Sequence, residues 1–127
     1  MTAVPPTNVR PKMTGIASVS VTSSTSTFDA LDLGGSTLSA IQMSTAWTDA
    51  SLTFQASLDG TNYFDVYSST GGEITYTTTA SRMLVFDPAT FLGLPYIKVR
   101  SGTSGTGVNQ AAARTISLGL VKMAPSQ

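Results

Sequence analysis

The stretch SLTFQASLDGTNYFDVYSS (residues 51–69) contains two strand-like segments separated by a turn. Apolar and polar residues alternate from Leu52 to Leu58, which is the pattern of a half-buried β-strand. Asp59-Gly60 follows, and the Asp-Gly pair tolerates the positive φ angles of tight hairpin turns. Residues 63–67 alternate again, with Phe64 and Val66 on one face. The stretch therefore predicts a β-hairpin whose register is set by its turn.

Similar short segments lie on both sides of this hairpin, separated by turn signals such as Gly34-Gly35 and Gly71-Gly72. Asp87-Pro88 predicts a helix N-cap followed by proline at the first helical position, so we expect one helical turn that ends at Gly93. The expected strands are 16–22, 25–33, 37–47, 52–58, 63–67, 73–79, 82–86, 95–100 and 114–123. We therefore predict an all-β fold, an antiparallel β-sandwich or jelly roll of about eight strands.

The first 15 residues differ from the rest because they are rich in proline. Proline has no backbone N–H and a fixed φ, so residues 1–15 predict an extended arm before a β-sandwich domain at 16–127. A frayed terminus is the alternative. If the arm lies on a neighbouring subunit, its interface residues are Pro5, Pro6, Arg10, Pro11 and Lys12.

Charged residues are scarce: they make up 11% of the chain, against an ordinary share of about 25%. Seven basic residues balance seven acidic ones, so no basic stripe is available to neutralise phosphates, which argues against a nucleic-acid partner. The 37 serines and threonines supply the polar surface instead. Such a neutral surface is typical of proteins that pack in arrays, because neighbouring copies repel one another only weakly.

The chain contains no cysteine and no histidine. It therefore lacks disulfides, cysteine-based metal sites, the commonest metal ligand and the commonest general base. We expect no enzyme activity, no catalytic or metal site and no cofactor. No apolar run approaches the roughly 20 residues that span a membrane, and the N-terminus lacks the apolar core of a signal peptide. We expect synthesis in a cytoplasm and no membrane partner.

Two sharper interpretations of the hairpin region compete with a purely structural one. Asp59, Asn62 and Asp65 offer oxygen ligands for calcium, but their spacing is not that of an EF-hand, and a turn is favoured. Trp47 is the single tryptophan and, with the tyrosines, offers a stacking platform for sugars; core filling is favoured. The tyrosines of that platform are Tyr63, Tyr67, Tyr76 and Tyr96.

Other polar groups carry weaker signals. The carboxylate pairs Asp29/Asp32 and Asp65/Glu73 are the nearest approach to a glycosidase arrangement, and solvated or turn-capping carboxylates are favoured instead. The Gly-rich segment at 101–107 lacks the lysine and the helix of a phosphate loop. The basic group on the last strands, available for acids on a neighbouring subunit or simply exposed, is Lys98, Arg100 and Arg114.

The segments LTFQASLDGTNYFDVY (52–67) and DPATFLGLPYIKVRSGTSGTGVNQAAARTISL (87–118) resemble small proteins of tailed-bacteriophage structural gene clusters. These include virion-associated β-sandwich proteins of the cement or decoration kind. The similarity covers residues 46–121. A looser similarity, through residues 57–63 and 96–100, is to discoidin-like jelly rolls, which often bind carbohydrate or lipid through loops at one end. The chain lacks the cysteines usual in those domains, so this second similarity bears on fold more than on activity.

The resemblance implies a structural virion protein of a tailed phage, a capsid decoration or cement protein that stabilises neighbouring major capsid proteins. It implies a location on the capsid exterior after synthesis in the bacterial cytoplasm. The expected partners are the major capsid protein and further copies of the chain, as a homodimer or homotrimer. The alternatives are a carbohydrate-binding or host-adhesion module, on a head fibre or tail, and a tail or head–tail completion protein. Besides the arm, the candidate interface residues are Asp59, Asn62, Ser101, Thr103, Asn109 and Gln110.

Overall fold

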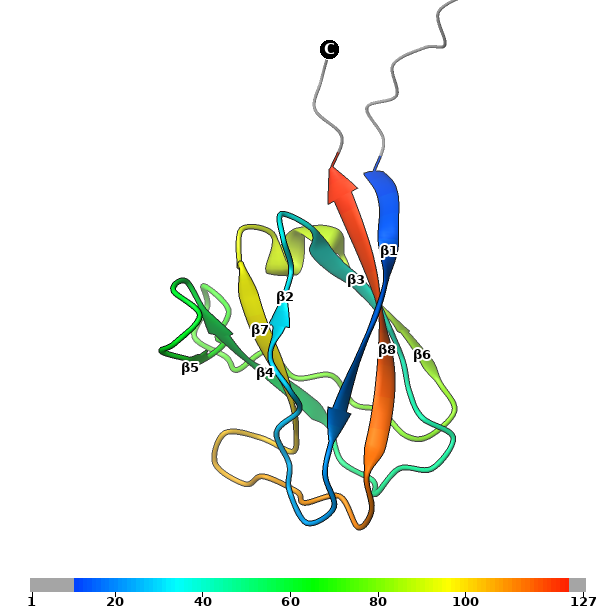
Figure 1. Cartoon of the computed structure of the whole chain (residues 1–127). Coiled ribbons are helices and arrows are strands. Elements are labelled where there is room, and N and C mark those ends of the chain that lie inside the picture. The colour runs from blue at the N-terminus through cyan, green and yellow to red at the C-terminus, as the bar shows by residue number, and fades with distance from the viewer. Residues whose placement is uncertain (1–10, 124–127) are drawn as a thin grey trace, which may run out of the picture.

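The structure, a computed structural model, describes residues 11–123, which form eight strands and one short 3₁₀ helix (Figure 1). The first half of the chain supplies β1 (Pro11–Val21), β2 (Leu31–Asp32), β3 (Thr37–Gln42) and β4 (Leu52–Ser57). The second half supplies β5 (Phe64–Asp65), β6 (Met83–Val85), η1 (Pro88–Phe91), β7 (Tyr96–Ser101) and β8 (Arg114–Met123).

The strands build two antiparallel sheets of four strands each. Sheet A has the order β1-β8-β3-β6, and sheet B has the order β2-β7-β4-β5. The antiparallel pairs include β1 with β8, β2 with β7, β3 with β6, and β4 with β5. This nesting arises when one long hairpin, folded between β4 and β5, rolls up into two sheets, which is a jelly roll. The predicted all-β sandwich is confirmed. The hairpin at residues 51–69 is the central turn of the long hairpin that rolls up into the two sheets.

The core lies between the sheets because alternate strand residues point inward. Sheet A contributes aliphatic side chains such as Ile41 and Leu118, and sheet B contributes Phe54 and Val99. Aromatic rings fill one end of the core. Their closest pairs have centroids 4.7 Å apart for Phe54 and Phe91 and 4.5 Å apart for Tyr76 and Phe86. Each fully buried side chain of this size contributes about 1.5–3 kcal/mol to folding.

The predicted helical turn is present as η1. Asp87 is its N-cap, and its carboxylate accepts a hydrogen bond from the backbone N–H of Ala89 at 3.0 Å. Pro88 is the first helical residue, where its missing N–H costs nothing. Phe91 projects from this turn into the core, so the cap positions one of the large core rings.

Only Phe64–Asp65 remain of the strand predicted at 63–67, and three further predicted strands are much shorter in the structure or absent from it. Residues 73–79 form no strand and pair only at the isolated bridges of Glu73 with Tyr67 and of Tyr76 with Leu52. Of residues 25–33, only Leu31–Asp32 belong to a strand, and β3 ends at residue 42 rather than 47. In each case the chain leaves the sheet to bury an aromatic ring, since packing overrides strand propensity.

β1 begins earlier than the expected domain boundary at residue 16. It starts at Pro11 and pairs with β8 through Met123 and Lys122, with a bulge between Met13 and Gly15. Proline is tolerated as the first residue of a strand, where no ladder hydrogen bond from its nitrogen is needed. Residues 11–15 are therefore part of strand β1 in sheet A. The remaining arm residues named above, Pro5, Pro6 and Arg10, lie outside the described residues.

Arg100 on β7 forms a buried ion-pair network on the outer side of sheet B. Its guanidinium lies 2.7 Å from the Asp65 carboxylate and 2.8 Å from the Glu73 carboxylate. Its Nε also donates to the hydroxyl of Thr53 on β4 at 2.9 Å. Glu73 in turn accepts from the backbone N–H of Ser104. One side chain thus joins β4, β5 and β7 to two loop segments.

We predict that Arg100→Ala lowers the free energy of unfolding by about 3 kcal/mol, because it leaves the buried Glu73 carboxylate unpaired. Asp65 is more exposed than Glu73, so water offsets part of its loss. Lys98→Ala is the matched control on the same strand. It removes a cation–π contact of 4.3 Å to the Tyr63 ring and costs about 0.5–1 kcal/mol. Urea denaturation measures both variants, and equal losses would contradict the network.

Candidate interaction site at the central hairpin

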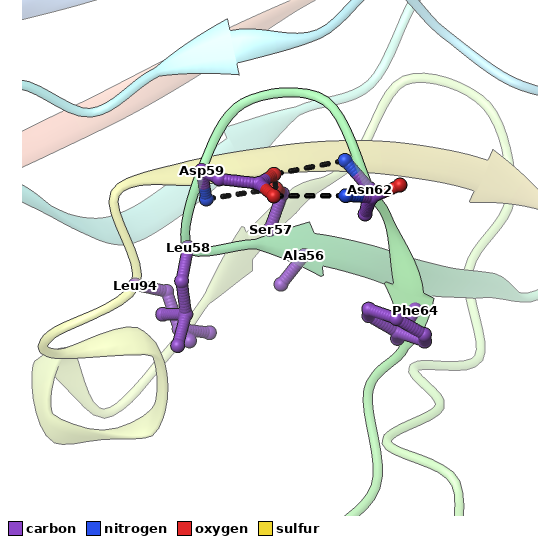
Figure 2. A pocket seen from close by; sticks show the side chains of 7 residues that line it. All are labelled: Ala56, Ser57, Leu58, Asp59, Asn62, Phe64 and Leu94. Atoms are coloured by element: carbon purple, nitrogen blue, oxygen red, sulfur yellow. Dashed lines mark hydrogen bonds between the residues drawn. The ribbon is translucent and has the colours of Figure 1, made fainter.

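The loop between β4 and β5 is closed by its own side chains (Figure 2). Asp59 Oδ1 accepts from the backbone N–H groups of Thr61 and Asn62, each at 2.8 Å, and from the Ser57 hydroxyl at 2.8 Å. Asp59 Oδ2 accepts from Asn62 Nδ2 at 2.9 Å. The Ser57 hydroxyl also accepts from the N–H of Gly60 at 2.8 Å. These hydrogen bonds are all made within the turn. The loop is therefore ordered by its own side chains, and its oxygen atoms are not arranged as an open ligand site.

The backbone N–H groups of Asn62 and Thr61 are the main reason that the pKa of Asp59 lies well below its usual range, helped by the side chains of Ser57 and Asn62. The carboxylate is therefore charged throughout the physiological pH range. Most of the hydrogen bonds that the Asp59 carboxylate can accept come from its own loop. Asp65, the third residue of the alternative calcium interpretation, is paired with Arg100. Within residues 11–123 no group of three or more acidic residues is placed to hold a metal ion.

An apolar notch lies next to this loop, with a volume of about 280 Å³. Leu58 and Phe64 are 78% and 72% exposed, although their size and apolarity would favour burial. Figure 2 shows Leu58 and Leu94 side by side, with Ala56 and Phe64 on the same side of β4 and the Asp59–Asn62 bonds on the other. The residues that line the notch are Ala56, Ser57, Leu58, Asp59, Asn62, Phe64 and Leu94.

The notch continues the inner face of sheet B beyond the covered core. Ala56 follows Phe54 at strand spacing and pairs with Phe64, so all three side chains share a face. Phe54 is buried, Ala56 is half-buried and Phe64 is exposed. Along this face the side chains therefore change from buried at Phe54 to exposed at Phe64. The notch is therefore an exposed apolar concavity bordered by a rim of the polar residues Asp59 and Asn62.

The alternation in residues 52–58 and 63–67 predicts that Leu58 and Phe64 lie on the apolar, core-facing side of their segments. They do lie on that side, but their side chains are exposed and not buried. Alternation tells which face a residue occupies, and it does not tell where the opposite sheet stops. Leu94, which follows Gly93 after η1, completes the notch from a segment far away in the sequence. No local pattern could have joined it to the hairpin.

The other candidate interface residues lie at the opposite end of sheet B. In the β4–β7 ladder, Ser57 pairs with Tyr96 and Leu52 pairs with Ser101, so residue 101 lies five positions along β4 from Ser57 at the notch. Thr103 is half-buried, and its hydroxyl accepts from the N–H of Thr106 within the loop. Asn109 is exposed.

Ser101 and Gln110 are buried, so we do not include them in an interaction surface. Gln110 Nε2 donates to the Thr48 carbonyl at 3.0 Å and to the Ser101 hydroxyl at 2.8 Å. Its Oε1 accepts from the N–H of Thr48 and from Nε of Arg114. These two polar side chains anchor the long Gly-rich loop from within.

The structure places Trp47, the central ring of the alternative sugar-platform interpretation, inside the core. Trp47 is buried and stacks on Phe28 with ring centroids 6.1 Å apart, while its indole N–H donates to the Ala50 carbonyl at 3.2 Å. Tyr76 packs against the core rings, and Tyr96 lies over Gly60. Trp47 is thus part of the core and does not offer an exposed stacking face, so its core-filling interpretation is confirmed.

Comparisons with known proteins add no family to this picture: no protein-family model, no curated protein and no solved structure matches the chain. In the described part of the chain, no helix has the length and hydropathy needed to cross a membrane.

We predict that Gly60→Val destabilises the protein by at least about 2 kcal/mol, whereas Asn62→Ala changes its stability little. Gly60 has φ +81°, and a Cβ there would meet the Tyr96 ring at 3.3 Å. Asn62→Ala removes one exposed hydrogen bond and leaves the backbone bonds to Asp59 in place. Thermal unfolding of both variants checks this ranking, which equal and severe losses would refute.

We predict that the loop stays closed to unusually low pH. Because the pKa of Asp59 is lowered on folding, its stabilising effect is complete above about pH 4, the ordinary aspartate pKa, and is lost as the pH falls through the lower folded value. The amide NMR signals of Thr61 and Asn62 should therefore stay in place between about pH 5 and pH 3. A titration of these amides centred near pH 4 would contradict the hydrogen-bonded carboxylate.

Proposed function

We propose that the protein is a structural component of a tailed-phage virion, and that it decorates the capsid exterior by binding neighbouring major capsid proteins. The observation that carries the proposal is the apolar notch at the central hairpin, where Leu58 and Phe64 are exposed beside a rigid polar rim. Exposed apolar side chains gathered in a concavity are typical of protein–protein contact sites. The resemblance of residues 52–67 and 87–118 to phage structural proteins supports the virion assignment.

The proposed mechanism is surface burial without chemistry. Covering Leu58 and Phe64 contributes about 1.5–3 kcal/mol for each side chain, before the cost of association is subtracted. Such a contact is weak for one copy, and many copies on a capsid together resist its expansion or rupture. The preformed rim supports this role, since Asp59 already orders the loop before a partner arrives.

The composition supports the same role. With net charge zero and few charged residues, many copies can lie close together without strong repulsion. The main ionisable cluster in residues 11–123, Arg100 with Asp65 and Glu73, is satisfied internally and offers no charged recognition patch. A chain without histidine or cysteine also fits a role that needs no catalysis.

We predict that the purified protein sediments with expanded empty heads of the phage that encodes it and raises their melting temperature. Leu58→Lys should weaken this binding at least about tenfold, because it places a charge in the apolar notch. Ile16→Lys is the matched control, since Ile16 is an apolar residue of similar exposure (77%) on the other sheet. Its binding should equal that of the unmodified protein.

Three results would count against the proposal. Binding to tail or head–tail preparations, with none to heads, would favour a completion protein. Retention on a glycan array with no affinity for virion parts would favour an adhesion module. Equal binding by Leu58→Lys and Ile16→Lys would remove the notch as the contact site.

A further inference from the structure

β6 forms an edge of sheet A whose outer side carries unused main-chain groups. Phe86 N–H donates to the Ser39 carbonyl at 2.8 Å, and the Arg82 carbonyl accepts from Met43 N–H at 2.8 Å. Backbone groups alternate in direction along an antiparallel strand. The N–H and C=O groups of Leu84 therefore face β3, and those of Met83 and Val85 face away from it. Their side chains are also exposed, by 56% and 80%.

Natural edge strands are normally protected by charged residues, proline, bulges or covering loops. The other edge of sheet A, β1, has such protection: it contains a bulge between Met13 and Gly15, and the Ser20 carbonyl accepts from Asp29 N–H. β6 has the sequence Met-Leu-Val, with no charge, no proline and no bulge. Of the two edges of sheet A, β6 is the one open to another strand.

We propose that β6 pairs with β6 of a second copy of the chain, antiparallel and across a two-fold axis at Leu84. In this register Met83 lies opposite the partner's Val85, and Val85 lies opposite the partner's Met83. The outward N–H and C=O groups of both residues are then hydrogen-bonded, and the two A sheets join into one continuous sheet. The exposed side chains of Met83 and Val85 become cross-strand neighbours on its outer face.

The charges that flank β6 suit an antiparallel copy. Arg82 precedes the strand and Asp87 follows shortly after it, and both residues are exposed. The two-fold places Arg82 of each copy near the partner's Asp87. Among residues 11–123 the Arg82 guanidinium has no ion-pair partner, and one oxygen of Asp87 caps η1 while the other is free for a partner. Parallel pairing would instead bring like charges together.

A three-residue edge buries less than the roughly 800 Å² per partner of an ordinary stable interface. The pairing is therefore weak and depends on concentration, and it becomes populated where copies are held close together. This inference does not rest on the proposed capsid function, since it uses a different strand, a different sheet and a different partner.

The test is sedimentation velocity of the full chain over about a hundredfold range of concentration, in which we expect a reversible monomer–dimer equilibrium. Val85→Pro should weaken dimerisation at least about tenfold, because proline removes an outward N–H and leaves the ladder to β3 intact. Val85→Lys should do the same through like-charge contact, and Ile16→Lys should dimerise normally. The melting temperature of each variant verifies that it is folded.

Crosslinking gives a second readout that does not depend on losing a contact. The chain has no cysteine, and residues at the two-fold position of an antiparallel pair have Cα atoms about 4.5 Å apart, within disulfide range. Leu84→Cys should therefore form a disulfide-linked dimer faster than Ile16→Cys, although Ile16 is the more exposed residue.

Three results would each overturn the proposal. They are a protein that stays monomeric at every concentration, Val85 variants that dimerise normally, and faster crosslinking through Ile16→Cys. Head binding that persists in monomeric Val85→Lys would separate this result from the proposed function.

Discussion

The ion pairs of Arg100 hold the central hairpin of the jelly roll, formed by β4 and β5, in place. β5 has only two residues, so its ladder with β4 provides few main-chain hydrogen bonds. Arg100 reaches from β7 past Thr53 on β4 and binds Asp65 on β5 and Glu73 beyond it. Every other strand pair nests around this hairpin, from β3 with β6 outward to β1 with β8. A charged side chain thus supplies the constraint that a longer β5 would otherwise supply.

The same network shows what the sequence could and could not predict. Alternation in residues 95–100, with Ile97 and Val99 facing inward, predicts that Arg100 lies on the outward side of its strand, and the structure confirms this. It could not show that residues 65–73 return across that side and bury the guanidinium, because this depends on a tertiary crossing. The hairpin and the Asp87 cap were predictable, since their signals are local and steric. The strand predicted at 73–79 was wrong, since the packing of Tyr76 against Phe54 and Phe86 overrides threonine-rich β-propensity.

The candidate site was predicted only in part, for a related reason. Asp59 and Asn62 mark the turn and form the rim of the notch, so the hairpin sequence located the right end of the molecule. The apolar part of the notch was hidden, because Leu58 and Phe64 follow the pattern of core residues. Their exposure depends on which segments pack against that face, which alternation along one strand does not reveal. Ser101 and Gln110 show the converse error, since a Gly-rich polar loop contains two of the buried polar side chains.

The low charge of the chain connects these features. Arg100, Asp65 and Glu73 pair with one another, and the apolar side chains of Leu58, Phe64, Met83 and Val85 remain exposed. The notch belongs to sheet B and β6 to sheet A, so contacts at the two surfaces do not compete for the same residues. A partner bound at the notch, as we propose, would fix copies side by side and raise the local concentration of β6 edges. The weak strand pairing, which in the free protein depends on concentration, would then be more highly populated on the assembled surface.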